Sequence, residues 1–207
     1  MNEGNVSLLH KHLKMTEIYF ILEGEGILYH GDKALQVEKG SYLVIPPDTP
    51  HKLKNIGESN LEHLVFAIPP FNPEDIEIIK ETSTENITPT KFNYDKAPIT
   101  ALDGALIYEL MSREEREQLD LSLAVGFLPP CKKSIPHYHK NSEELYYVID
   151  GCGKVKIGDQ YFEIKRGSVV YIPTNKVHAL ENESDSKKLE VLCISSPAYK
   201  EEDFFIE

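Results

Sequence analysis

Short apolar runs that end at glycine or proline recur along most of the chain. They are rich in β-branched and aromatic residues, which is typical of β-strands bounded by turns. Many short strands at regular spacing predict an all-β sandwich or a closed barrel. The runs lie at residues 17–24, 34–40, 41–47, 144–151, 154–158, 161–167 and 168–173.

Two segments depart from this pattern. Residues 74–82 (EDIEIIKET) and 111–118 (MSREEREQ) look helical, and both are short. In contrast, residues 153–164 (GKVKIGDQYFEI) predict a hairpin that turns at Gly158 and Asp159. The chain is therefore expected to be almost entirely β.

The second half of the chain repeats the first. A shift of 127 residues places residues 10–55 on residues 137–182 without a gap, and one inserted residue then carries 61–75 onto 189–203. A repeat this long means that each copy is a domain rather than a solenoid unit.

The division into domains follows from the repeat. We expect an N-terminal domain at residues 1–80 and a C-terminal domain at residues 99–207. The segment between them, residues 81–98, is polar, holds two prolines and lacks periodicity, so it is predicted to be a linker.

The two copies differ in completeness. Residues 105–111 and 121–130 predict two strands ahead of the second copy, whereas only nine residues precede His10 in the first. The N-terminal barrel is therefore expected to be short of strands, and an uncovered strand edge invites pairing. We expect the segment 83–112 to fold back onto it, or a homodimer to exchange strands.

Each copy carries a cluster of three histidines and one glutamate at fixed spacing. The H-x-H pair puts two imidazoles on one face of a strand, because strand side chains alternate with period two. Neutral imidazoles and one carboxylate suit a borderline divalent ion such as Mn, Fe, Ni, Co, Cu or Zn. The predicted metal ligands, for up to two ions per chain, are His10, His12, Glu17, His51, His137, His139, Glu144 and His178.

These motifs resemble those of the cupin superfamily. They read G-x5-H-x-H-x4-E-x6-G and G-x5-P-x-D-x2-H-x3-N in the first copy, and the second copy keeps the ligand intervals. The resemblance implies two tandem jelly-roll β-barrels, each holding one metal with three histidines and one glutamate.

The motifs depart from the family pattern at three glycine positions, and none of these is a ligand. Asp48 and Asn175 replace one glycine, and both tolerate the left-handed turn it would take. Cys131 replaces another. Glu143 competes with Glu144 as a ligand, and we choose Glu144 because it keeps six residues before Gly151.

The tyrosine two residues after each glutamate lies on the same, inward face of the strand as that glutamate. Tyr19 and Tyr146 are candidates either for core packing or for a phenol aimed at substrate, which would make them catalytic.

The only arginines are Arg113, Arg116 and Arg166, and none lies in a predicted strand facing a pocket. This counts against oxalate-type decarboxylation and tight phosphosugar recognition, because bidentate arginine is the usual anchor for carboxylate or phosphate.

The sequence leaves three classes of function open. The resemblance implies a small-molecule enzyme of the isomerase, epimerase or dioxygenase type, or a non-catalytic module that binds metal or a small ligand. A vestigial, purely structural bicupin is the third alternative. A pocket with a titratable group beyond the metal ligands would favour catalysis.

The net charge and the cysteine content limit the possible partners and the cellular compartment of the protein. The net charge of −12 argues against a nucleic-acid partner, which needs clustered cations, and no apolar run is long enough for a membrane span. The odd number of cysteines, three, indicates reduced thiols. We therefore expect a cytoplasmic protein with a small-molecule ligand.

Overall fold

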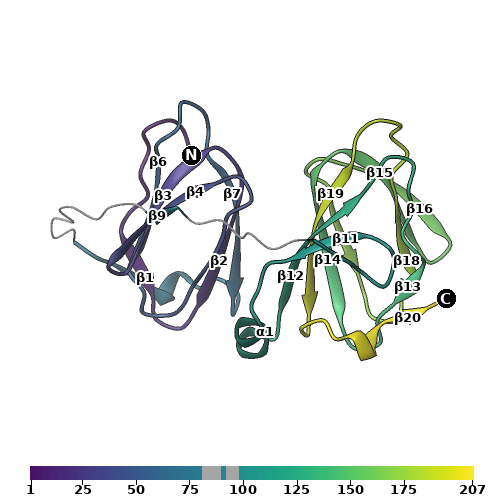
Figure 1. The fold of residues 1–207 in the computed structure, drawn as a ribbon. Coiled ribbons are helices and arrows are strands. Elements are labelled where there is room, and N and C mark those ends of the chain that lie inside the picture. Colours follow the sequence, from purple (N-terminus) through teal and green to yellow (C-terminus); the bar gives the residue numbers. More distant parts are fainter. Residues whose placement is uncertain (81–89, 92–97) are drawn as a thin grey trace. The chain divides into compact units, whose positions relative to one another are not determined.

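The computed structural model describes residues 1–80, 90–91 and 98–207, and it separates into two units, Met1–Asp95 and Lys96–Glu207. Each unit is built from β-sheets, as the apolar pattern predicts, and their strands pair antiparallel except for β9 beside β4 (Figure 1). Most of the expected linker, residues 81–89 and 92–97, lies outside the described residues.

The N-terminal unit contains a six-stranded sheet in the order β8-β1-β6-β3-β4-β9 and a three-stranded sheet in the order β5-β2-β7. Its elements are β1 (His10–His12), β2 (Thr16–Glu23), β3 (Glu25–His30), β4 (Lys33–Glu38), β5 (Tyr42–Ile45), β6 (His51–Asn55), β7 (Glu62–Ile68), the 3-10 turn η1 (Pro73–Asp75), β8 (Ile76–Ile78) and β9 (Thr90–Lys91).

The C-terminal unit contains a six-stranded sheet, β10-β11-β12-β19-β14-β17, and a five-stranded sheet, β16-β15-β18-β13-β20. Its elements are β10 (Ile99–Thr100), β11 (Leu106–Glu109), α1 (Arg113–Leu119), β12 (Ser122–Leu128), β13 (His137–Tyr138), β14 (Glu143–Asp150), β15 (Cys152–Ile157), β16 (Gln160–Lys165), β17 (Val169–Ile172), β18 (His178–Glu181), β19 (Leu189–Ser196), η2 (Glu201–Asp203) and β20 (Phe205–Ile206).

Each unit has its own apolar core between its sheets, and a tyrosine that follows the glutamate ligand belongs to it. Tyr19 packs with Ile21, Leu28 and Leu53 in the N-terminal unit. The corresponding core of the C-terminal unit contains Tyr146, Val148, Leu128, Val155, Leu189 and Val191. Burial of these side chains supplies the main stabilisation of each barrel.

The turns confirm several details of the motifs. Asp48 and Asn175 have φ of 59° and 60°, so the residues that replace a glycine do adopt the left-handed conformation. Cys131 does the same, with φ of 57°, at the position equivalent to Gly4. The hairpin of β15 and β16 turns at residues 158–159, as expected.

One helix prediction is confirmed and the other is wrong. Residues 113–119 form α1, which begins with a capping box between Ser112 and Glu115. Residues 74–82 were expected to be helical, but residues 73–75 form a 3-10 turn and residues 76–78 form strand β8, which pairs with β1. The alternation of Ile76, Glu77 and Ile78 has the strand period, and the edge of β1 receives it.

The asymmetry between the copies is visible at one strand. β19 pairs with both β12 and β14, whereas its equivalent β7 pairs only with β2 among the described residues. Val65, which lies opposite Tyr19 in the β2–β7 ladder, is 47% exposed. Thr90–Lys91 does join the N-terminal unit, but in parallel with β4 rather than at β7.

Other residues of the segment that was expected to fold back onto the N-terminal unit belong to the C-terminal unit instead. Residues 106–109 form β11, which pairs with β12 in the C-terminal unit. Residues 83–89 and 92–97 lie outside the described residues. Within the part of the chain that the structure describes, no helix is long and apolar enough to cross a membrane.

Candidate metal centres

The fold brings the four predicted ligands of each copy together. Within each cluster the candidate donor atoms all lie within 4.8 Å of one another. The first histidine of each cluster lies opposite the last one across a pair of strands, His10 opposite His51 and His137 opposite His178. The glutamates come from the facing sheet, on β2 and β14.

Backbone carbonyls fix the orientation of the imidazoles. In the C-terminal cluster, Nδ1 of His137, His139 and His178 lies 2.9 Å from the carbonyl oxygen of Ile135, Asp203 and Lys176, respectively. A carbonyl can only accept, so Nδ1 donates its hydrogen, and Nε2 faces the cluster, where it binds either a proton or a metal ion.

The N-terminal cluster is oriented similarly, with one difference. Nδ1 of His10 and His51 donates to the carbonyl oxygens of Leu8 and Thr49, each at 2.9 Å. His12 is buried, and neither of its ring nitrogens has a hydrogen-bond partner among the described residues. A buried polar atom without a partner costs free energy, and a metal ion would satisfy it.

The distances between the glutamate oxygens and the histidine nitrogens indicate that each cluster suits a cation. Nε2 of His51 lies 2.9 Å from Oε2 of Glu17, and Nε2 of His178 lies 2.9 Å from Oε2 of Glu144. A lone pair and a carboxylate oxygen this close require a positive charge between them, either a proton or a metal. Three nitrogens and one oxygen form a donor set suited to a borderline divalent ion.

The electrostatics of the C-terminal cluster favour a charged carboxylate. Burial opposes ionisation of Glu144, but the hydrogen bond from His178 and the nearby imidazoles outweigh it and lower the pKa of Glu144 to about 2. Burial lowers the pKa of His137 to about 4, so its ring is neutral at physiological pH. Neutral histidines and an ionised glutamate are the protonation states that bind metal.

The pKa shifts in the N-terminal cluster have the same directions as those in the C-terminal cluster. Burial opposes ionisation of Glu17 as well, yet the hydrogen bond from His51 and the other imidazoles lower its pKa. Burial also lowers the pKa of His12. Both clusters are therefore suited to a divalent ion.

The structure places the two candidate tyrosines next to the glutamates. The hydroxyl of Tyr146 donates to Oε2 of Glu144 at 2.9 Å, and Ser195 donates to Oε1 at 3.2 Å. The ring centroid of Tyr19 lies 6.1 Å from that of His51 and 5.1 Å from that of His63. Both tyrosines are buried, and burial raises the pKa of both phenols.

Sequence reasoning missed an aspartate that supports each cluster. The Asp203 carboxylate accepts the backbone N–H groups of Asn141 and Ser142, and its carbonyl accepts the Nδ1 hydrogen of His139. In the N-terminal unit, Asp75 accepts the N–H of Met15 at 3.0 Å. The two aspartates occupy equivalent positions of the repeat, which was the signal available in the sequence.

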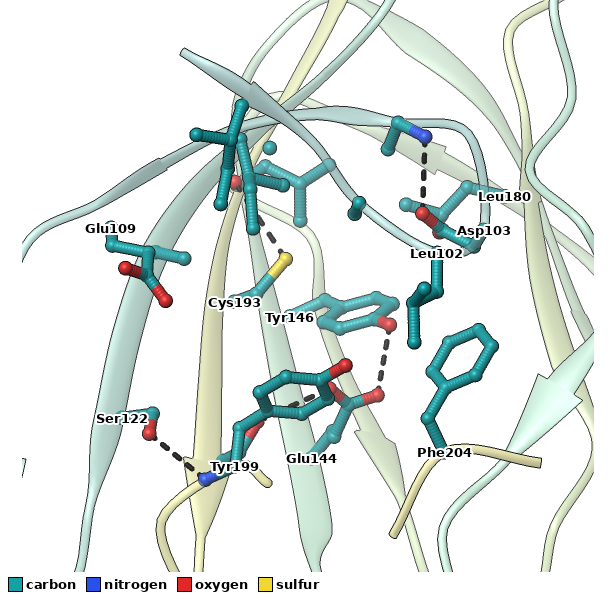
Figure 2. A pocket seen from close by; sticks show the side chains of 18 of the residues that line it. Leu102, Asp103, Glu109, Ser122, Glu144, Tyr146, Leu180, Cys193, Tyr199 and Phe204 are labelled. Carbon is teal, nitrogen blue, oxygen red and sulfur yellow. Dashed lines mark hydrogen bonds between the residues drawn. The ribbon is translucent and has the colours of Figure 1, made fainter. Parts of the chain in front are cut away.

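A cavity of about 190 Å³ lies beside the C-terminal cluster and is lined by His137, His139 and Glu144. Figure 2 shows part of its wall around Glu144 and Tyr146. Most of the remaining wall is apolar. Titratable groups beyond the ligands also line it, so the cavity meets the criterion that favours catalysis. They are Asp103, Glu109, Arg116, Tyr146, Cys193, Tyr199 and Glu201.

Arg116 corrects part of the sequence reasoning. It lies outside the predicted strands, but α1 carries it to the cavity wall. Its Nη1 donates to Oε1 of Glu109 at 3.2 Å. An arginine is therefore available to the C-terminal cavity after all.

Comparison with known proteins agrees with this architecture. A family model described as "Cupin domain" matches residues 1–67 and 125–195. An uncharacterised protein of Methanocaldococcus jannaschii is 37% identical over 114 residues, which are 55% of this chain and 90% of that protein. Quercetin 2,3-dioxygenase of Bacillus subtilis is 23% identical over 233 residues, covering 90% of this chain and 69% of that protein.

Among solved structures, oxalate decarboxylase of Lactobacillus farciminis matches with a TM-score of 0.74 and 18% sequence identity. The match covers 97% of this chain and 76% of that protein. At this identity the similarity shows a shared fold.

Proposed function

This chain belongs to the cupin family, as a bicupin with two three-histidine, one-glutamate metal sites, and from this premise we propose that its C-terminal domain is a metal-dependent dioxygenase for a small, oxygenated single-ring compound. The observation that carries the proposal is the largely apolar cavity that opens onto His137, His139 and Glu144.

The size and polarity of the cavity support this substrate class. An engineered protein cavity of about 150 Å³ binds benzene, so 190 Å³ accommodates roughly one substituted ring. Leu123, Phe127, Leu128 and Val191 contribute apolar walls that a small dianion would not fill favourably. A ring with one or two oxygens would place its polar end towards the metal ligands.

The residues of the C-terminal centre have two roles, holding the metal ion and positioning the Glu144 ligand. His137, His139, Glu144 and His178 would hold the ion, and a bound transition metal would supply Lewis-acid and redox chemistry at that place. Tyr146 and Ser195 hold the Glu144 carboxylate through their hydroxyl groups, so we assign them as positioning residues. In the overall reaction, both atoms of O₂ enter the substrate, which supplies all the electrons.

The test is oxygen uptake by the full chain, loaded separately with Fe²⁺, Mn²⁺, Co²⁺ or Ni²⁺. We expect catechol- or salicylate-sized compounds to consume oxygen, and mass spectrometry to find two ¹⁸O atoms in the product from ¹⁸O₂. Quercetin, with three rings, should react poorly. His178→Ala should abolish uptake and the matched variant His51→Ala should retain it.

Other outcomes would overturn the proposal. Substrate conversion without oxygen uptake would indicate the isomerase class, which the sequence left open. Tight binding without conversion would indicate a ligand-binding cupin. Uptake lost with His51→Ala and kept with His178→Ala would place the reaction in the N-terminal unit.

The expectations about boundaries, setting and assembly belong to the same proposal. We propose the domains at residues 1–80 and 99–207. The three free cysteines, Cys131, Cys152 and Cys193, support a reducing, cytoplasmic setting. The exposed Val65 lies beside an edge of β7 that has no partner strand among the described residues, and this supports a homodimer.

A further inference from the structure

Tyr199 lies on the loop after β19 and lines the same cavity as the metal ligands. Its ring meets the ring of His139 edge-on, with centroids 5.8 Å apart and an interplanar angle of 84°. Figure 2 shows the ring projecting from its loop towards the space that Tyr146 and Glu144 also face.

The backbone of this loop is fastened to the start of β12. The N–H of Tyr199 donates to Oγ of Ser122 at 2.9 Å, and the N–H of Ala198 donates to Oδ1 of Asp120 at 3.2 Å. The ring is therefore held in place by its backbone and by His139, independently of its hydroxyl.

The hydroxyl of Tyr199 makes no hydrogen bond to any residue that the structure describes. The hydroxyls of Tyr146 and Ser195, in contrast, already donate to Glu144. A phenol is an O–H donor at neutral pH, so Tyr199 offers an unused donor at the cavity wall close to the metal ligands.

The repeat supplies an internal control for this residue. The equivalent of Tyr199 is Phe71, whose ring meets His12 edge-on with centroids 6.4 Å apart and an interplanar angle of 78°. The same packing is therefore achieved without a hydroxyl. The oxygen of Tyr199 is an addition that packing does not require.

We propose that the hydroxyl of Tyr199 donates a hydrogen bond to an oxygen of the substrate in the C-terminal cavity. Tyr199 thereby selects ring compounds that carry an oxygen acceptor next to the metal-binding end. This proposal rests on the proposed function, because it takes the cavity as the substrate site.

The experiment measures binding of a probe without turnover. The full chain carrying His51→Ala, so that only the C-terminal cluster holds metal, is loaded with Zn²⁺ and titrated with 4-nitrocatechol under argon. Absorbance reports the dissociation constant. Tyr199→Phe should weaken binding about tenfold, the effect of one lost hydrogen bond, and leave zinc content and melting temperature unchanged. Tyr161→Phe, at an exposed tyrosine of β16, is the matched control.

Three results would overturn the proposal. Equal affinity in Tyr199→Phe and its parent would show that the hydroxyl does not contact the probe. A lower melting temperature or zinc content in Tyr199→Phe would make the hydroxyl structural. A parent protein that does not bind the probe would show that the cavity does not take an oxygenated ring.

The two proposals can fail separately. Weakened binding in Tyr199→Phe together with no oxygen uptake by any metal-loaded form would leave the recognition role standing and remove the dioxygenase. Oxygen uptake with unchanged probe affinity in Tyr199→Phe would do the reverse.

Discussion

Acid should destabilise the metal-free C-terminal unit through His137. Burial lowers the pKa of this imidazole from 6.5 to about 4. Between these values the unfolded chain binds a proton that the folded protein does not, so stability falls as the pH drops through this window. Above pH 6.5 both states are neutral at this residue, and it contributes no pH dependence.

The magnitude follows from the shift. At 1.36 kcal/mol per pKa unit, the full effect is about 3 kcal/mol, and most of it is reached at pH 4.5. His178 acts in the opposite direction: burial lowers its pKa, but the hydrogen bond and the charge of Glu144, together with the carbonyl of Lys176 and the charge of Asp103, outweigh burial and raise it. Glu144, with its pKa lowered to about 2, adds acid sensitivity as the pH approaches 4.5 and below. The net change in the wild type therefore differs from the contribution of His137 alone.

The variant His137→Phe isolates that contribution. Phe204 already stacks on the ring of His137, with centroids 4.4 Å apart, so an apolar ring fits the same space. Hydrogen exchange in chelator, read on peptides from β12, β14 and β19, gives the free energy of unfolding of this unit alone. Between pH 7.5 and 4.5 the wild type should lose roughly 2–3 kcal/mol more than the variant.

The matched control is His10→Phe at the equivalent position of the N-terminal unit. It should leave the pH dependence of β12, β14 and β19 unchanged. If His137→Phe keeps the full acid sensitivity of the wild type, or if NMR shows His137 titrating near pH 6.5, the reasoning from burial is refuted.

Two further predictions concern the metal and the turns. His178→Ala should remove one metal ion per chain by elemental analysis and lower the melting temperature only when metal is present; an equal loss in chelator would make this histidine structural. Gly151→Ala should cost about 2–5 kcal/mol in urea unfolding, because φ is +87° and a Cβ would lie 2.6 Å from the carbonyl oxygen of Lys188. Gly158→Ala, with φ of +57° and open space, should cost only about 1 kcal/mol, and equal losses would contradict the steric argument.

The repeat made the metal clusters predictable. Strand alternation places both histidines of H-x-H on one face whatever the rest of the fold does, and the repeat showed the same intervals twice. Glu144 could be chosen over Glu143 from spacing alone, and the structure brings Glu144 into the cluster and leaves Glu143 exposed.

The cavity could not be read from the sequence, because its walls come from separate elements. Arg116 reaches it from a helix and Tyr199 from a loop. The failure at residues 74–82 has a related cause. The local pattern predicts a helix there, and pairing with the edge of β1, a tertiary feature, makes residues 76–78 a strand instead.

The two copies keep the same ligands and diverge on one wall. The positions along β7 and its following loop are His63, Val65, Ala67 and Phe71, and their equivalents on the β19 side are Val191, Cys193, Ser195 and Tyr199. A metal fixes the type and placement of its ligands closely, whereas wall residues need only match the molecule beside it. Ser195 gives Glu144 a hydroxyl donor that Ala67 cannot give Glu17. The two sites therefore combine the same set of metal ligands with different neighbouring side chains.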